Sequence, residues 1–141
     1  MISEIGRNQL AGYIVEKSSV ILNSNMFNEL YITPSIRFDA LSEQVQDELL
    51  AVTALLETFG PSLGRPHVDT LAGSKHANMK ELRFNAADGV WRVAFAFDPK
   101  RQAILLVAGD KSGVGQRRFY KGLVRVADKR FADHVKSLKE N

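Results

Sequence analysis

The chain has 141 residues, of which 45% are hydrophobic and 25% charged, as in a soluble globular protein with a single core. The absence of cysteine excludes a disulfide scaffold, a thiolate nucleophile and cysteine-based metal sites. The net charge of +3 is unevenly spread, since residues 39–57 hold five acidic and no basic residues, whereas residues 111–130 hold seven basic residues and one acidic residue. The basic segment is either a solvated helix face or a surface for a polyanion.

The first 25 residues differ from the rest of the chain. Their apolar residues follow only a weak helical pattern, at Ile5, Leu10, Ile14 and Ile21. Residues 23–25 have the composition of a linker, so we expect an N-terminal extension over 1–25 and one domain over 26–141. The extension could be a frayed helix, a packing appendage or translation from an upstream start. Without a signal peptide or a membrane-length apolar run, we expect a cytoplasmic protein that does not contact a membrane.

A strand is expected at residues 28–33, ending at Pro34, and a helix follows it. Ser42 is suited to cap that helix, and Gly60 followed by Pro61 ends it. Its apolar residues recur every three or four positions and predict a core-facing stripe, at Leu41, Val45, Leu49, Val52, Leu56 and Phe59.

Three strands are then predicted, over residues 79–84, 90–98 and 103–109. In the second, bulky residues alternate with Arg92, two alanines and Asp98. We expect a buried bulky face and a shallow face on which Arg92 is exposed enough to meet a ligand. Its pairing with a surface carboxylate is the alternative. Residues 98–101 form a turn, and the third strand leads to Lys111 in a flexible loop.

A final helix is predicted over residues 115–138, packed through Leu123, Ala127, Phe131 and Val135. Its first turns present Arg117, Arg118, Tyr120 and Lys121. These cations, like those at the strand ends, have no acid beside them in the pattern, which favours a phosphodiester backbone as ligand. The three histidines are expected to be turn-forming or exposed residues. No cluster of Asp, Glu and His predicts a metal site.

The strings GPSLGRPHVDTLAGSKHANMKELR, WRVAFAFDP, LLVAGDKSG and RRFYKGL resemble the HigB-type toxins of bacterial and phage toxin–antitoxin modules, which belong to the RelE superfamily. The likeness extends over residues 28–135. It implies an α+β fold in which a small, mainly antiparallel sheet packs with N-terminal helices and a C-terminal helix beside the catalytic surface.

The resemblance also implies a reaction. Toxins of this type cut mRNA in the ribosomal A site without a metal or cofactor, by attack of a 2′-hydroxyl on the adjacent phosphate. It implies that Arg92 stabilises the phosphorane, that Lys111 supplies a second positive charge and that Tyr120 transfers a proton or stacks on a base. An ordinary tyrosine has a pKa near ~10, so Tyr120 as a base would need its cationic neighbours to lower that pKa.

Five further cations are implied to hold RNA phosphates: Lys80, Arg83, Arg117, Arg118 and Lys121. Because Glu81 separates Lys80 from Arg83, which of the two faces the substrate stays open. The implied partners are the ribosome, its mRNA and a helix-turn-helix antitoxin of the HigA type, through which alone operator DNA is contacted. Two alternatives remain: a ParE-like gyrase inhibitor of the same fold, and a non-catalytic nucleic-acid-binding module whose binding weakens steeply with salt.

Overall fold

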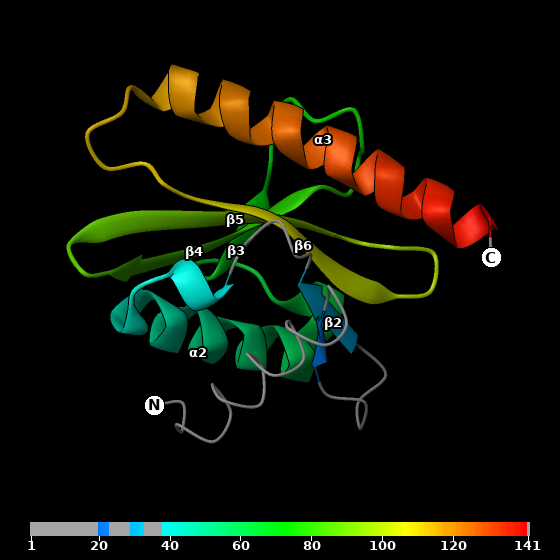
Figure 1. Ribbon diagram of the computed structural model, residues 1–141, viewed down its shortest axis with the longest axis horizontal. Helices are drawn as coiled ribbons and strands as arrows, with labels where there is room; N and C mark the ends of the chain where they lie inside the picture. The colour runs from blue at the N-terminus through cyan, green and yellow to red at the C-terminus, as the bar shows by residue number, and fades with distance from the viewer. Residues whose placement is uncertain (1–19, 23–28, 33–37, 141) are drawn as a thin grey trace.

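The computed structural model describes residues 20–22, 29–32 and 38–140. The strands are β1 (Val20–Leu22), β2 (Glu29–Ile32), β3 (Val68–Thr70), β4 (Lys80–Ala86), β5 (Gly89–Phe97) and β6 (Gln102–Asp110). The helices are η2 (Phe38–Ala40), α2 (Glu43–Phe59), η3 (Gly60–Ser62) and α3 (Gln116–Glu140). The described strands form one sheet of order β1-β2-β6-β5-β4-β3, and α2 and α3 lie on its opposite faces (Figure 1). Every neighbouring pair is antiparallel except β2 with β6. The predicted α+β class with a small, mainly antiparallel sheet is confirmed.

The edge of the sheet includes part of the predicted extension. Strand β2 falls where a strand was expected, and β1 pairs with it through Ile21 opposite Tyr31. The weak helical pattern is therefore wrong at Ile21. Residues 1–19 of the predicted extension and its linker at 23–25 lie outside the described residues, and the boundary at residue 26 stays a prediction.

Helix α2 forms as its sequence predicts. Ser42 accepts a hydrogen bond from the backbone N–H of Val45, 3.3 Å away, and Gly60 ends the helix with φ of 55°. Four stripe residues are buried in the core: Val45, Leu49, Val52 and Leu56. The prediction is wrong for Phe59, whose side chain is 52% exposed, because the chain turns away into η3 directly after it.

The two faces of β5 pack against different helices. Val93 and Phe95 belong to the apolar cluster that includes α2, whereas Ala94 and Ala96 belong to the cluster that includes α3. The alternation is thus as predicted, but both alanines are buried, so the expectation of a shallow, open face is wrong there. Because the two alanine side chains are small, α3 packs closely on the sheet. The helix therefore occupies the space that was expected for a ligand.

Helix α3 packs through its predicted residues, since Leu123, Ala127 and Phe131 are buried and Val135 packs beside them. Its far end is tied to the predicted β5–β6 turn, where the side chains of His134 and Asp98 approach to 2.9 Å. The other carboxylate oxygen of Asp98 accepts from the backbone N–H groups of Lys100 and Gln102, each at 2.9 Å. No helix in the described ranges is both long and apolar enough to cross a bilayer.

Candidate functional site

A buried polar cluster joins β4, β5 and α3 where the helix begins. The Nε of Arg92 lies 3.2 Å from both the Tyr120 hydroxyl and a carboxylate oxygen of Glu81. The Tyr120 hydroxyl donates to that same Glu81 oxygen at 2.9 Å, and Nη1 of Arg92 donates to the carbonyl of Trp91 at 2.9 Å. Each of the three side chains therefore fixes the orientation of the other two.

The structure corrects one expectation about Arg92 and supports the alternative to it. The residue is only 6% exposed, because Tyr120 from the first turns of α3 contacts its guanidinium. The alternative, a carboxylate partner, is what the structure shows, although this partner is not at the surface: it is Glu81, which is itself 5% exposed. A buried arginine without a carboxylate would be strongly destabilising, so the pairing is physically required.

Glu81 is the member of the cluster that the sequence patterns did not single out. It faces Ala94 across the β4–β5 pair, and Arg83 faces Arg92 on the same side of the sheet. A strand alternates its side chains, so Glu81 and Arg83 share a face and Lys80 lies on the other, with Leu82. This alternation was available in the sequence, but which strand face α3 would cover was not.

An open cavity of about 780 Å³ lies over the cluster. Tyr120 and Glu81 line it together with three predicted cations, Arg83, Lys111 and Arg117, and with the pair Arg65 and Asp69. Nε of Arg65 donates to the Asp69 carboxylate at 3.1 Å, and this hydrogen bond is the main cause that lowers the pKa of Asp69. Arg83 lies farther from that carboxylate, at 3.8 Å, and 3.6 Å from Glu81. The cavity is therefore bordered by more positive than negative groups, as an anionic ligand requires.

Lys111 is positioned by the end of β6. Its backbone N–H donates to the carbonyl of Val90 at 2.8 Å, and Asp110 accepts from the N–H groups of Val90 and Ser112. Gly89 leaves room for this Asp110, because a Cβ there would lie 2.7 Å from the carboxylate. The Lys111 ammonium sits 5.6 Å from the centroid of the Tyr120 ring.

The environment changes the acidity of Lys111 and of Tyr120 in opposite directions. Burial lowers the pKa of Lys111, and the positive charges of Arg92 and Arg83 lower it further, although Glu81 acts against them. Burial raises the pKa of Tyr120, and the hydrogen bond from Arg92 only partly offsets this. The cations therefore do not bring Tyr120 into the range of an ordinary base. It stays a neutral phenol that donates to Glu81.

The remaining predicted residues divide into two groups. Lys80 lies on the opposite face of the sheet, so the structure does not bring it to the cavity. A second cavity, a groove beside the first, is lined by α3 and by residues of the β3–β4 loop such as Ala72 and His76. Arg118 is exposed on α3 and lines neither this groove nor the first cavity, whereas Lys121 lines the groove with Tyr120. No histidine lines the first cavity, and no group of three or more His, Cys, Asp or Glu residues within the described ranges could hold a metal ion.

The fold and the cluster together define a class: a small α+β protein with a cation-lined cavity above a buried Glu–Arg–Tyr cluster. Residues 37–132 match the model of the family described as Phage derived protein Gp49-like (DUF891). Because this match covers well over half of the 141 residues, the chain belongs to the Gp49-like family.

Two proteins of Mycobacterium tuberculosis (strain ATCC 25618 / H37Rv) are similar in sequence. The chain is 43% identical to one named "Putative toxin HigB2" over 98 residues, 69% of this chain and 48% of that protein. It is 46% identical to "Putative toxin HigB3" over 93 residues, 66% of this chain and 79% of that protein. It thus spans about half the length of the first relative. No solved structure gives a significant match. The predicted kinship with HigB-like toxins is confirmed.

Proposed function

We propose that this protein is the toxin of a type II toxin–antitoxin module and a ribosome-dependent mRNA endoribonuclease acting in the cytoplasm. The observation that carries the proposal is the position of the Tyr120 hydroxyl. It lines a cation-bordered cavity and donates, at 2.9 Å, to the carboxylate of Glu81, a 5% exposed residue that also borders this cavity. A hydroxyl held this way can pass a proton from a substrate in the cavity to the carboxylate beneath it.

The reaction proceeds in one displacement. The ribose 2′-oxygen attacks the adjacent phosphorus, its proton moves to the Tyr120 oxygen, and the phenolic proton moves to Glu81. The bond from phosphorus to the 5′-oxygen breaks, which leaves a 2′,3′-cyclic phosphate and a 5′-oxygen. Lys111 protonates that oxygen, and the pKa lowered by burial makes its ammonium a better acid than an ordinary lysine. Exchange with water then restores both groups.

The cations have separate roles in this scheme. Arg83 and Lys111 line the cavity and stabilise the charge of the phosphorane, and Arg117 holds a flanking phosphate. Arg92 is buried behind Tyr120, so we assign it a positioning role: it orients the phenol and the Glu81 carboxylate. Arg118 and Lys121 extend the basic surface along α3 toward mRNA or ribosomal RNA. Control of such a toxin requires an antitoxin, for which we propose a helix-turn-helix protein of the HigA type.

The experiment that tests the proposal is primer extension on mRNA from cells that express wild type or Tyr120→Phe. Loss of the hydroxyl removes the relay but leaves the pairing of Arg92 with Glu81, so the fold is kept. We expect cuts within translated codons to fall by about 10²–10⁴-fold, the size of a general acid–base contribution. Glu81→Gln, which cannot accept the proton, should lose the cuts as well, but it leaves the buried charge of Arg92 without a carboxylate, so its cuts are compared per folded molecule.

The matched control is Thr58→Val, which removes an exposed hydroxyl from α2 and should leave the cuts unchanged. Growth arrest without cuts in the wild type would contradict the proposal and point to another target such as gyrase. Cuts that persist in Tyr120→Phe would remove Tyr120 from the reaction.

A further inference from the structure

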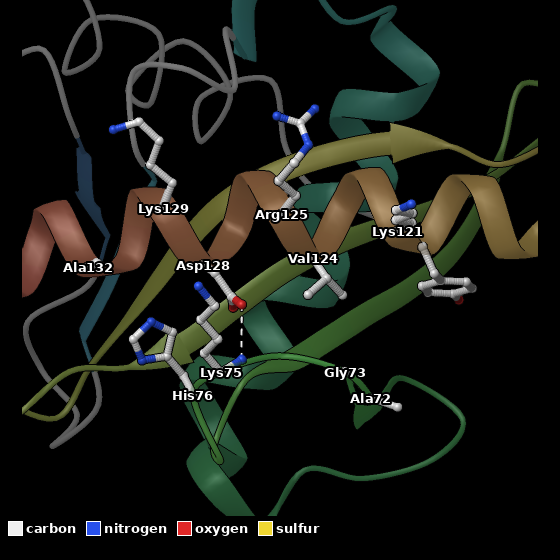
Figure 2. Close-up of a pocket in the computed structure, with 11 residues that line it drawn as sticks. Ala72, Gly73, Lys75, His76, Lys121, Val124, Arg125, Asp128, Lys129 and Ala132 are labelled. Carbon is white, nitrogen blue, oxygen red and sulfur yellow. Dashed lines mark hydrogen bonds between the residues drawn. The ribbon is translucent and has the colours of Figure 1, made fainter.

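A groove of about 800 Å³ runs beside the candidate site, between α3 and the loop of residues 71–79 that joins β3 to β4 (Figure 2). Val124 and Ala132 line it from the helix, and Ala72 and His76 line it from the loop. From Tyr120 to Ala132 the helix rises by about 18 Å, at about 1.5 Å per residue. The groove is therefore an elongated surface, longer than one mononucleotide.

The loop is held to the helix by one carboxylate. Asp128 accepts from the Ser74 hydroxyl with one oxygen and from the backbone N–H of Lys75 with the other, at 2.9 Å (Figure 2). The Ser74 hydroxyl also accepts from the backbone N–H of His76 at 3.0 Å, and the His76 ring packs edge-on against Phe131. These contacts fix the groove's wall, so the groove is preformed.

The charges around the groove are mostly positive. Four cations line it: Lys75, Lys121, Arg125 and Lys129. Asp128 is the one acid among its lining residues, and both of its oxygens are engaged by the loop. Figure 2 shows Val124 and Asp128 pointing toward the loop while Arg125 and Lys129 project from the other side of the helix. An apolar channel edged by cations suits a strand that has flat apolar bases and one phosphate per unit.

The groove is continuous with the candidate site, because Tyr120 lines both it and the cavity that holds Arg83 and Lys111. We infer that a single-stranded RNA tract leaving the scissile phosphate lies in this groove, with its bases toward Val124 and Ala132 and its phosphates toward Lys75 and Lys121. This inference rests on the proposed function for the identity of the strand. A single RNA strand can occupy the groove and the cavity at once, because the two meet at Tyr120. An acidic peptide in the groove would not explain why the groove joins the candidate site, so the continuity favours RNA.

The test compares Ala132→Glu with Ala54→Glu. Both alanines are exposed and helical, and both variants add one negative charge, but only Ala132 lines the groove, and Ala54 belongs to α2 on the other face of the sheet. The probes are fluorescein-labelled oligouridylates of about 4 and about 10 nucleotides, lengths that bracket short single-strand sites. Methylation of every 2′-oxygen prevents their cleavage. Fluorescence anisotropy measures the dissociation constants at low and moderate salt.

We expect the longer RNA to bind the wild type more tightly than the shorter one. Ala132→Glu should weaken binding of the longer RNA by about fivefold, with a smaller salt dependence, and change the shorter RNA by less than about twofold. Ala54→Glu should match the wild type with both. Equal affinities in the two variants would overturn the inference, including the case in which the groove binds a peptide.

The result does not depend on cleavage. If the wild type fails to cut mRNA but Ala132→Glu selectively loses the longer RNA, the groove is a binding path and the proposed reaction is wrong. If the wild type cuts mRNA and the two variants bind alike, the reaction stands and the groove assignment fails.

Discussion

The two faces of the central sheet are built from the same strands but differ in chemistry. Toward α2, the sheet contributes a continuous apolar layer that includes Leu82, Val93 and Leu105. Toward α3, an apolar cluster at the middle of the helix gives way near its first turns to the buried Glu81 and Arg92 and the partly buried Tyr120. Strand β5 serves both, since Val93 faces one side and Arg92 the other.

The difference between the two faces shows how a small domain can hold a site whose buried charged groups cost free energy of folding. Burying a carboxylate and a guanidinium costs free energy because both groups lose their hydration. Their attraction to each other offsets this loss, but the pair contributes no more stability than well-packed apolar side chains of similar size would. Here the apolar layer toward α2 and the apolar cluster at the middle of α3 supply the hydrophobic stabilisation, so the region near the first turns of α3 can hold polar groups at fixed distances. We therefore expect substitutions on the two faces to affect different properties.

The largest expected effect is on stability and comes from the α2 face. Leu49 is fully buried in the apolar layer, so Leu49→Ala should lower the free energy of unfolding by about 2–5 kcal/mol. Urea denaturation measures this change. Cleavage per folded molecule should stay at the wild-type level. Glu48→Ala, at the exposed neighbouring position, should change stability by less than about 0.5 kcal/mol. A loss of activity in folded Leu49→Ala would show that the two faces are not separate.

A second expectation separates the two faces of β4. Arg83→Ala removes a cation from the cavity and should slow cleavage by about 10²-fold, the effect of losing one group that stabilises a transition-state charge. Lys80→Ala removes the same charge from the opposite face and should change the rate by less than about twofold. In vitro translation with a defined mRNA gives both rates. Equal losses would mean that Lys80 reaches the substrate.

The smallest expected effect is a change in pH dependence. Lys111 has a pKa below its ordinary value, and a neutral lysine cannot protonate the leaving oxygen. The cleavage rate should therefore fall as the pH rises through that lowered pKa. Arginine stays protonated over this range, so Lys111→Arg should cut more slowly at neutral pH, by about tenfold, but without the alkaline fall. The measurement is the cleavage rate of the wild type and of Lys111→Arg from neutral pH to about pH 9.5, which is below the pKa of an ordinary lysine. The same alkaline fall in Lys111→Arg would exclude Lys111 as the acid.

Local patterns predicted much of the fold. Helix α2 with its Ser42 cap, strand β2, the alternation along β5 and the packing residues of α3 could all be predicted, because each depends on residues near one another in the chain. The exceptions lie at element ends and edges. Phe59 continues the apolar stripe to the last residue of α2, directly before Gly60 turns the chain, and Ile21 belongs to an edge strand too short to have a clear pattern.

The sequence by itself determined which elements form, which faces of them are apolar and which residue types are available for chemistry. It also placed Arg83, Lys111, Arg117 and Tyr120 as candidates that the structure gathers around one cavity. Only the tertiary structure decided that Arg92 is buried, that Glu81 is its partner and that Lys80 faces away. These outcomes depend on which face of the sheet α3 covers. That choice is fixed by contacts between residues tens of positions apart, such as Glu81 and Tyr120, and no local spacing encodes it.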